Sequence, residues 1–284
     1  MSRRGGPAGG RGGPWSRRTL RALAFALIVA GALALVDGVV TLAWQEPVSA
    51  LYAAIRQDHL SGALRTVERA PPTPLETRTL ASIPDEQARI TFLARELERR
   101  AREGSAVGRI LIPSIGASFV VVKGTKTGDL EGGPGIFPET GFPGVPGTTA
   151  IAGHRTTYLA PFRHIDALRH GNRILLNMPY AHLTYTVLGR RIVAPTNVQA
   201  AVANVGYSRV VLSACTPLFS AEKRILVYGR LTRIVPVGAA RQLPGGALAR
   251  AIGSPLAPAA ASPRQSLPAV LEPLQPHLLA PLNQ

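Results

Sequence analysis

The chain has 284 residues, enough for one ordinary globular domain with extensions at its ends. Its formal charge at neutral pH is +16, a balance found in proteins that bind nucleic acid or an anionic cell envelope, and equally in proteins with a solvated basic face. Tyr and Phe are only scattered through the chain, so we expect no nucleic-acid partner.

The N-terminal region predicts a single membrane span. Residues 1–21 contain six arginines and no acidic residue, and residues 22–44 are almost entirely apolar, long enough to cross a hydrocarbon core as a helix. The positive-inside bias then places a basic N-terminus in the cytoplasm and everything after Trp44 outside the cell. Two alternatives remain: a twin-arginine export signal around Arg17-Arg18, and a cleaved signal peptide.

Residues 45–103 are predicted to form an extracellular helical stalk and linker. An amphipathic helix is expected at about 48–67, and the Pro-rich segment 70–74 ends it. A second helix is expected over 85–103, because Ser82, Pro84 and Asp85 are residues typical of a helix start.

From about residue 104 the pattern changes to short β-rich runs separated by Gly and Pro, which continue to residue 236. Gly189 predicts a tight hairpin between two of these runs, and a short helix is expected to begin at Pro161. Eight short strands with few helices favour an all-β fold, a closed eight-stranded barrel with short helices. The expected strands are 109–112, 118–122, 148–152, 173–177, 183–188, 190–194, 209–214 and 223–233.

The C-terminal segment, residues 237–284, is rich in Pro and Ala and shows little periodicity. This composition predicts a disordered tail.

Three side chains at predicted strand ends form a candidate cysteine acyl-transfer site. Cys215 is the only cysteine, His154 follows one strand, and Arg224 begins another. A thiol can attack a carbonyl, an imidazole can move the proton, and a guanidinium can stabilise an oxyanion. Spacing alone leaves the ordinary interpretations open: a buried apolar cysteine, a structural histidine and a surface arginine.

The sequence around these residues resembles the sortase family of membrane-anchored cysteine transpeptidases. The family's nucleophile motif is Thr-Leu-x-Thr-Cys, and residues 211–215 are Val-Leu-Ser-Ala-Cys, with both threonines replaced. Residues 153–158, Gly-His-Arg-Thr-Thr-Tyr, resemble the family's histidine region, and 224–227 its arginine strand. The 153–158 string and Trp44-Gln45-Glu46-Pro47 look most like class E, although Leu159 stands where that subgroup often has glycine.

The resemblance implies a sortase-type barrel over 104–236 and a function for the chain. Cys215, His154 and Arg224 would be catalytic, and Tyr158, Ala214 and Thr216 are candidate substrate-binding residues. The enzyme would cleave a C-terminal sorting signal (LAxTG or LPxTG-like) between Thr and Gly, form an acyl-enzyme, and transfer the protein to a peptidoglycan-precursor amine or a pilin lysine. No metal or organic cofactor is expected.

Two other classes of protein remain open. One is another cysteine acyl-transferase that acts on peptidoglycan, such as an L,D-transpeptidase, although Ser213-Ala214-Cys215 lacks the glycine usual in that motif. The other is a non-catalytic surface scaffold that keeps the barrel.

Overall fold

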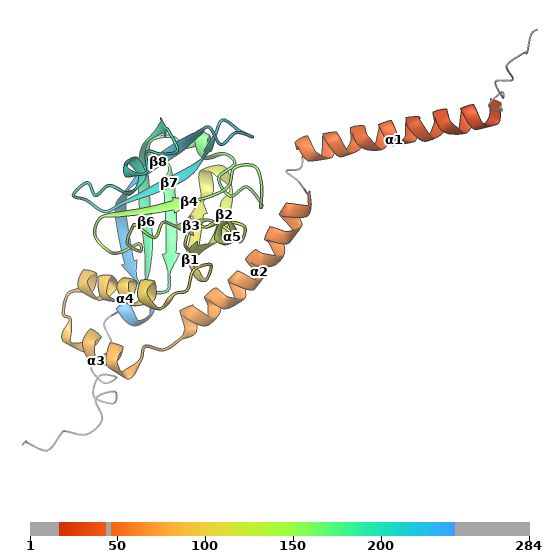
Figure 1. Cartoon of the computed structure of the whole chain (residues 1–284). Helices are drawn as coiled ribbons and strands as arrows, with labels where there is room; N and C mark the ends of the chain where they lie inside the picture. The colour runs from red at the N-terminus through yellow and green to blue at the C-terminus, as the bar shows by residue number, and fades with distance from the viewer. Residues whose placement is uncertain (1–16, 44–46, 242–284) are drawn as a thin grey trace, which may run out of the picture.

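The computed structural model describes residues 17–43 and 47–241. The strands form a closed β-barrel, and helices precede it in the chain (Figure 1). The strands are hydrogen-bonded around the barrel in the order β1–β2–β3–β4–β7–β8–β6–β5, and β5 closes against β1. The expected closed eight-stranded barrel is therefore confirmed. The strands are β1 (Ala106–Ile112), β2 (Ala117–Lys123), β3 (Gly135–Ile136), β4 (Thr148–Ala152), β5 (Arg173–Met178), β6 (Ala181–Val193), β7 (Arg209–Thr216) and β8 (Lys223–Pro236).

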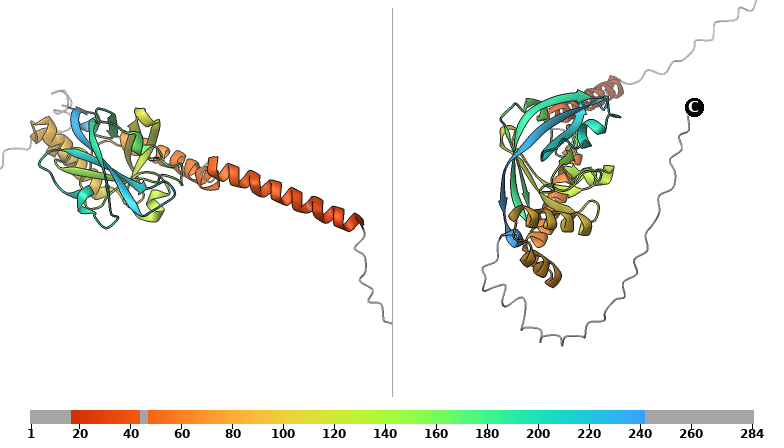
Figure 2. Two further views of the ribbon diagram at one scale, coloured as in Figure 1. Left: turned by 90° about the horizontal axis from the view of Figure 1, so that it is seen from above. Right: turned by 90° about the vertical axis from the view of Figure 1, so that its left-hand side faces the viewer.

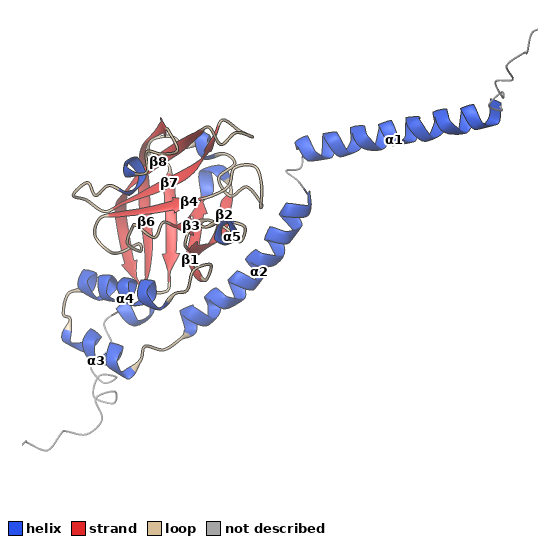
Figure 3. Cartoon of the chain, viewed as in Figure 1, coloured by secondary structure: helices blue, strands red, loops and turns tan. Residues whose placement is uncertain are grey.

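The longer helices precede the barrel in the chain, and the short ones lie in the connections between strands (Figure 3). Within the described residues the α-helices are α1 (Arg17–Ala43), α2 (Pro47–Arg69), α3 (Pro74–Ser82), α4 (Glu86–Arg100), α5 (Thr127–Leu130) and α6 (Gln199–Val202). Short 3-10 turns are η1 (Pro113–Ile115), η2 (Ile165–Ala167) and η3 (Gly238–Ala240).

The barrel combines parallel and antiparallel pairs, and this brings particular strand ends together. β2 pairs with β3 and β4 pairs with β7 in parallel, whereas the other neighbouring strands are antiparallel. Because β4 and β7 run in the same direction, their C-terminal ends lie at the same rim of the barrel. β8 begins at that rim, since it is antiparallel to β7.

Apolar side chains fill the barrel and also cover part of its outer surface. The main core joins strand residues such as Ile110, Leu176 and Leu212 to side chains from α4. A second cluster, which includes Val211 and Leu226, lies on the other face of β7 and β8 beneath α6. Because both faces of β7 are covered, its sequence is a nearly continuous apolar run and does not alternate.

Strand β6 corrects the prediction of a hairpin at Gly189. The two expected strands, 183–188 and 190–194, form one continuous strand that pairs with β8 along its length. The register shifts between Val187 and Gly189, which leaves Leu188 as the extra residue of a bulge. An isolated glycine in a strand pattern is compatible with a bulge as well as a turn, so the prediction of a turn was wrong. The eighth strand is instead β3, which is only two residues long.

Helix α1 is the predicted apolar segment, and the side chains of residues 19–39 are exposed. A 21-residue stretch from Thr19 to Val39 has a mean hydropathy of 2.3, long and apolar enough to cross a membrane. The helix begins at Arg17, earlier than the predicted start at residue 22, and Trp44 lies outside the described residues. Figures 1 and 2 show α1 projecting away from the barrel.

Helix α2 and helix α4 correspond to the two predicted stalk helices. Gln57 fastens α2 to the barrel, because its side chain bonds both the N–H and the C=O of Val120, at 2.8 and 3.1 Å. Helix α4 begins at Glu86, one residue after the predicted start, and Asp85 is its N-cap, with the carboxylate accepting from the Ala88 N–H. Arg89 in α4 is buried.

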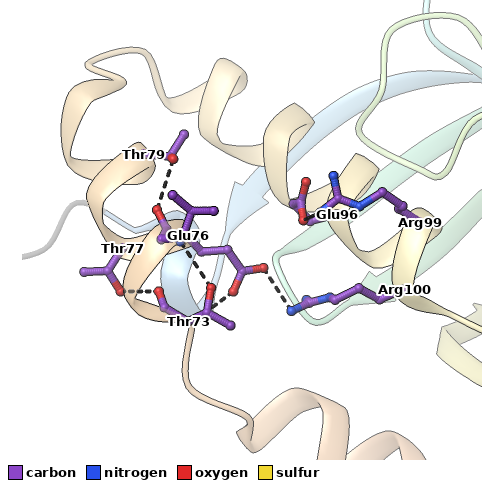
Figure 4. A network of polar contacts seen from close by, with 8 residues as sticks. Thr73, Glu76, Thr77, Thr79, Glu96, Arg99 and Arg100 are labelled. Carbon is purple, nitrogen blue, oxygen red and sulfur yellow. Dashed lines mark hydrogen bonds and ion pairs between the residues drawn. The ribbon is translucent and has the colours of Figure 1, made fainter.

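Helix α3 was not predicted, since it follows directly on the Pro-rich segment. Figure 4 shows how it starts: the Thr73 hydroxyl accepts from the Glu76 N–H, and the Glu76 carboxylate accepts from the Thr73 N–H. The same carboxylate forms an ion pair of 2.9 Å with Arg100 of α4. The sequence Thr-Pro-Leu-Glu at 73–76 is thus a capping box with proline at the first helical position.

Residues 237–241, which the sequence assigned to the predicted tail, pack against the rest of the structure. Ala240 is completely buried, and its C=O accepts a hydrogen bond of 3.0 Å from the Arg89 side chain. The Val237 N–H donates to the Tyr180 C=O. Residues 237–241 therefore belong to the folded unit, and the rest of the predicted tail, 242–284, lies outside the described residues.

Candidate active site

Cys215, His154 and Arg224 meet at the rim where β4, β7 and β8 come together. Cys215 is directly paired with Arg224 across the β7–β8 ladder. His154 lies two residues beyond the end of β4, and the Gly153 N–H donates to the Ser213 C=O at 3.0 Å. The barrel therefore places three residues that are far apart in the sequence beside one another.

All three residues line one pocket of about 370 Å³. Cys215 is partly exposed there and is a free thiol. The pocket wall is mainly apolar, which excludes water from a reacting group and strengthens electrostatic interactions. The lining residues are Thr125, Leu130, Phe137, Ala152, Gly153, His154, Val193, Ala194, Pro195, Asn197, Val198, Ala201, Ser213, Ala214, Cys215, Arg224 and Leu226.

The Arg224 guanidinium is held by the backbone of the loop before β8. One terminal nitrogen donates to the C=O groups of Ala221 and Lys223, at 2.9 and 3.2 Å. A guanidinium carries five N–H donors in a fixed plane, so donors remain for a ligand in the pocket. A carbonyl oxygen that gains negative charge is such a ligand.

His154 is a partly buried imidazole close to a carboxylate. Burial lowers the pKa of His154 below its ordinary value, and the negative charge of Glu131 opposes this shift. The Nε2 atom is buried and has no hydrogen-bond partner among the described residues. A neutral imidazole with an unengaged nitrogen in a pocket can accept or return a proton.

Arg155, the residue after His154, links the histidine loop to the cysteine strand. Its guanidinium donates to the Thr216 hydroxyl at 3.2 Å and to the Cys215 C=O at 3.4 Å. It also forms an ion pair of 2.9 Å with Asp166, and its side chain is only 3% exposed. This role of Arg155 was not predicted from the sequence, although the residue lies within the 153–158 string that resembles the family.

The loop after His154 has an unusual backbone conformation. Tyr158, Leu159 and Ala160 have φ values of 50°, 62° and 41°, the left-handed region that glycine adopts readily and other residues avoid. Leu159, at the position where class E often has glycine, therefore has a φ value that glycine would adopt more readily. The Phe162 N–H donates to the His154 C=O at 3.0 Å and so closes the loop.

The three predicted substrate-binding residues have different positions. Ala214 lines the pocket beside the thiol. Thr216 is buried, and its hydroxyl accepts from Arg155. Tyr158 lies over the His154 ring, with ring centroids 5.2 Å apart, and its hydroxyl donates to Glu131. Neither Thr216 nor Tyr158 is among the lining residues of the pocket, and the substrate contacts of all three residues stay predictions.

The described residues do not contain a cluster of three or more His, Cys, Asp or Glu side chains that could hold a metal ion.

Comparisons with known proteins agree on one family. Residues 110–232 match the sortase domain family. Sortase D from Bacillus subtilis (strain 168) is 30% identical over 130 residues, which cover 45% of this chain and 64% of that protein. Sortase SrtE1 from Streptomyces coelicolor is 28% identical over 99 residues, 32% of this chain and 28% of that protein.

Among solved structures, the SrtF sortase from Corynebacterium diphtheriae is similar, with 27% identity and a TM-score of 0.46 over 49% of this chain and 90% of that chain. The matched stretches span less than two thirds of the curated relatives. These relatives carry two different class names, so class E membership stays a prediction. The eight strands form a sortase-type barrel, and residues 110–232 match the sortase domain family, whose members are cysteine transpeptidases.

Proposed function

We propose that the chain is a membrane-anchored transpeptidase that cleaves a C-terminal sorting signal and joins the cleaved protein to an amine of the cell wall. One observation carries the proposal: Cys215 and Arg224 are paired across β7–β8 and share an apolar pocket with His154. A nucleophile, a proton carrier and a cationic hydrogen-bond donor are the groups that acyl transfer from a peptide bond requires.

In the first half-reaction the neutral His154 imidazole takes the proton of the Cys215 thiol, and the sulfur attacks the threonine carbonyl of the signal. The carbonyl oxygen gains negative charge, which the Arg224 guanidinium stabilises. The C–N bond then breaks, His154 gives a proton to the departing glycine amine, and a thioester remains on Cys215. Burial that keeps the pKa of His154 low favours the neutral imidazole, so the ring is able to take a proton again in the second half-reaction.

In the second half-reaction an amine attacks the thioester. His154 accepts the proton that the amine loses, the C–S bond breaks, and the thiolate of Cys215 is released. The new amide bond replaces the one that was broken, so the reaction needs no oxidant or cofactor. A peptidoglycan-precursor amine or a pilin lysine is the proposed acceptor.

The proposed location is the cell membrane, with α1 as a single span. Its length and hydropathy, together with the six arginines of residues 1–21, support a cytoplasmic N-terminus and an extracellular barrel. Protease added to intact cells is expected to degrade the barrel and to leave the N-terminal segment. A protected barrel would contradict this topology.

The reaction is tested by incubating the detergent-solubilised full chain with sorting-signal peptides and an amine, followed by mass spectrometry. We expect a thioester on Cys215 and an amide product. Cys215→Ala should remove the thioester and the amide product, and His154→Ala and Arg224→Lys should lower turnover by several orders of magnitude. A peptidoglycan stem peptide is tested separately as an alternative acyl donor. Near-full turnover by Arg224→Lys would contradict the oxyanion role, and acylation by the stem peptide alone would indicate a different transferase.

A further inference from the structure

Helix α2, the first helix after the apolar segment, contacts the loop that follows His154 through the rings of Tyr52 and Tyr158. The ring of Tyr52 packs edge-on against the ring of Tyr158, with centroids 6.4 Å apart and planes at 65°. Tyr158 in turn lies 5.2 Å from the His154 ring. Three aromatic rings therefore connect α2 to the catalytic imidazole.

A second, polar connection runs beside these rings. Arg56 of α2 donates to the Tyr52 hydroxyl at 3.0 Å and forms an ion pair of 3.8 Å with Glu131. Glu131 accepts from the Tyr158 hydroxyl at 3.3 Å, and it is the carboxylate whose charge acts on His154. Arg56 and Tyr158 therefore both contact the Glu131 carboxylate, whose negative charge raises the pKa of His154.

Close packing fixes α2 in this place. Gln57 makes hydrogen bonds to the main chain of Val120 and to the Gly132 C=O. A Cβ atom on Gly133 would lie 2.3 Å from the Gln57 amide nitrogen, and one on Gly132 would lie 3.2 Å from Leu60. The glycine pair therefore lets the helix approach the segment that follows Glu131, and the contact leaves no room for another residue at position 133.

We propose that α2 is part of the active site, and that Tyr52 and Arg56 are positioning residues that hold Tyr158 and Glu131 against His154. The inference rests on the proposed transpeptidase function for its consequence in turnover. Its geometric content is independent of that function: the stalk, the ring of Tyr158 and the carboxylate of Glu131 set the orientation and the electrostatic surroundings of the imidazole. A barrel that lacks α2 would keep Cys215, His154 and Arg224 but lose this support.

Turnover of the full chain in detergent, with an accepted sorting peptide, tests the positioning role. We expect Arg56→Gln and Tyr52→Ala to lower kcat about tenfold or more and to change KM little, because a displaced proton carrier slows chemistry more than binding. Arg56→Lys and Tyr52→Phe, which keep the charge and the ring, should remain within about threefold of wild type.

Arg65→Gln, which alters an exposed arginine on the same helix, is the matched control and should match wild type. The melting temperature of each variant separates positioning from folding: Arg56 and Glu131 are both partly exposed, so their ion pair adds little to stability. Unchanged kcat in Arg56→Gln and Tyr52→Ala would overturn the proposal. So would a loss of kcat that accompanies a large fall in melting temperature and is not restored in Arg56→Lys.

Alkylation of Cys215 by iodoacetamide gives a readout that needs no sorting peptide. The rate of modification of this single thiol is measured against pH by mass spectrometry, and the step absent from His154→Gln is assigned to the imidazole. In Glu131→Gln this step should move to lower pH, because the carboxylate that raises the pKa of His154 is gone. Glu139→Gln, which alters an exposed carboxylate, should leave it in place.

A step that stays at the wild-type pH in Glu131→Gln would overturn the contact between Glu131 and His154. If no sorting peptide is cleaved while the alkylation step moves as expected, the proposed function fails and the positioning network stands.

Discussion

Arg155 and Asp166 should contribute very unequally to the stability of the barrel, although they form one ion pair. The Arg155 side chain is 3% exposed, whereas that of Asp166 is 53% exposed. Removal of the guanidinium leaves buried acceptors without donors, but removal of the carboxylate charge leaves the guanidinium with its main-chain and hydroxyl partners.

The magnitudes follow from the hydrogen bonds. Arg155 donates to the C=O groups of Arg163 and Cys215 and to the Thr216 hydroxyl over 3.2–3.4 Å, distances at the long end for such bonds. At roughly 1 kcal/mol for each lost bond, Arg155→Met should lower the free energy of unfolding by about 3 kcal/mol. Asp166→Asn should cost less than about 1 kcal/mol, because an ion pair with one exposed partner is screened by water.

The assay is urea unfolding of the full chain in detergent, followed by near-ultraviolet circular dichroism of the buried tyrosines, Tyr180 and Tyr185. Tyrosine is the chosen probe because the two tryptophans, Trp15 and Trp44, precede the barrel in the sequence. Equal losses in Arg155→Met and Asp166→Asn would refute the reasoning, because the exposed charge and not the buried donors would then carry the interaction.

Four further predictions concern the stability of the folded unit and the choice of peptide substrate. Burial lowers the pKa of His154 in the folded state below 6.5, so the unfolded chain binds more protons just below that pH. The free energy of unfolding should therefore rise as pH rises through this range, and urea unfolding of His154→Gln at several pH values should show a weaker dependence on pH. Gly153→Ala would place a Cβ 2.6 Å from the Phe162 ring, so we expect about 1–3 kcal/mol of destabilisation by the same assay, and wild-type stability would contradict the close contact. A chain that ends at Arg241 should melt like the full chain. A chain that ends at Pro236 should lose about 2–4 kcal/mol of unfolding free energy, because Arg89 loses its acceptor and the buried Ala240 is removed. Similar melting of the two truncated chains would place 237–241 outside the folded unit. The resemblance of residues 153–162 to class E predicts that the chain cleaves Leu-Ala-x-Thr-Gly peptides roughly ten- to a hundredfold faster than the proline version, and equal kinetics in wild type would disprove this preference. Because the Tyr158 hydroxyl donates to Glu131, we expect Tyr158→Phe to keep the preference.

The parts of the fold that the sequence predicted are those with strong local patterns. β4, β7 and β8 are apolar and β-branched runs bounded by turn residues, and the residues of the candidate site lie at their ends, beside motifs that resemble a known family. The start of α4 near Asp85 was found for the same reason. In each case the information lies within a few residues of the element.

The missed features depend on neighbours that are distant in the sequence or on an ambiguous residue. β3 has two residues, too few to show a period, and is defined by its partners β2 and β4. Gly189 was taken for a turn because a bulge can be distinguished from a turn only when the facing strand is known. Tyr52 contacts Tyr158 and Arg56 contacts Glu131, residues that lie far from them in the sequence. Such contacts carry no local signal, so the stalk could not be linked to the candidate site from the sequence.

The hydrogen bonds of Gln57 also limit the distance between the barrel and α1. A domain on a loose tether explores a large volume, but here the first stalk helix is docked to the barrel, and the connection to α1 consists of residues 44–46. Three residues span at most about 10 Å when fully extended. If α1 crosses the membrane as proposed, the pocket stays at a nearly fixed height above the bilayer, and a sorting signal must be presented at that height while it is still near the membrane.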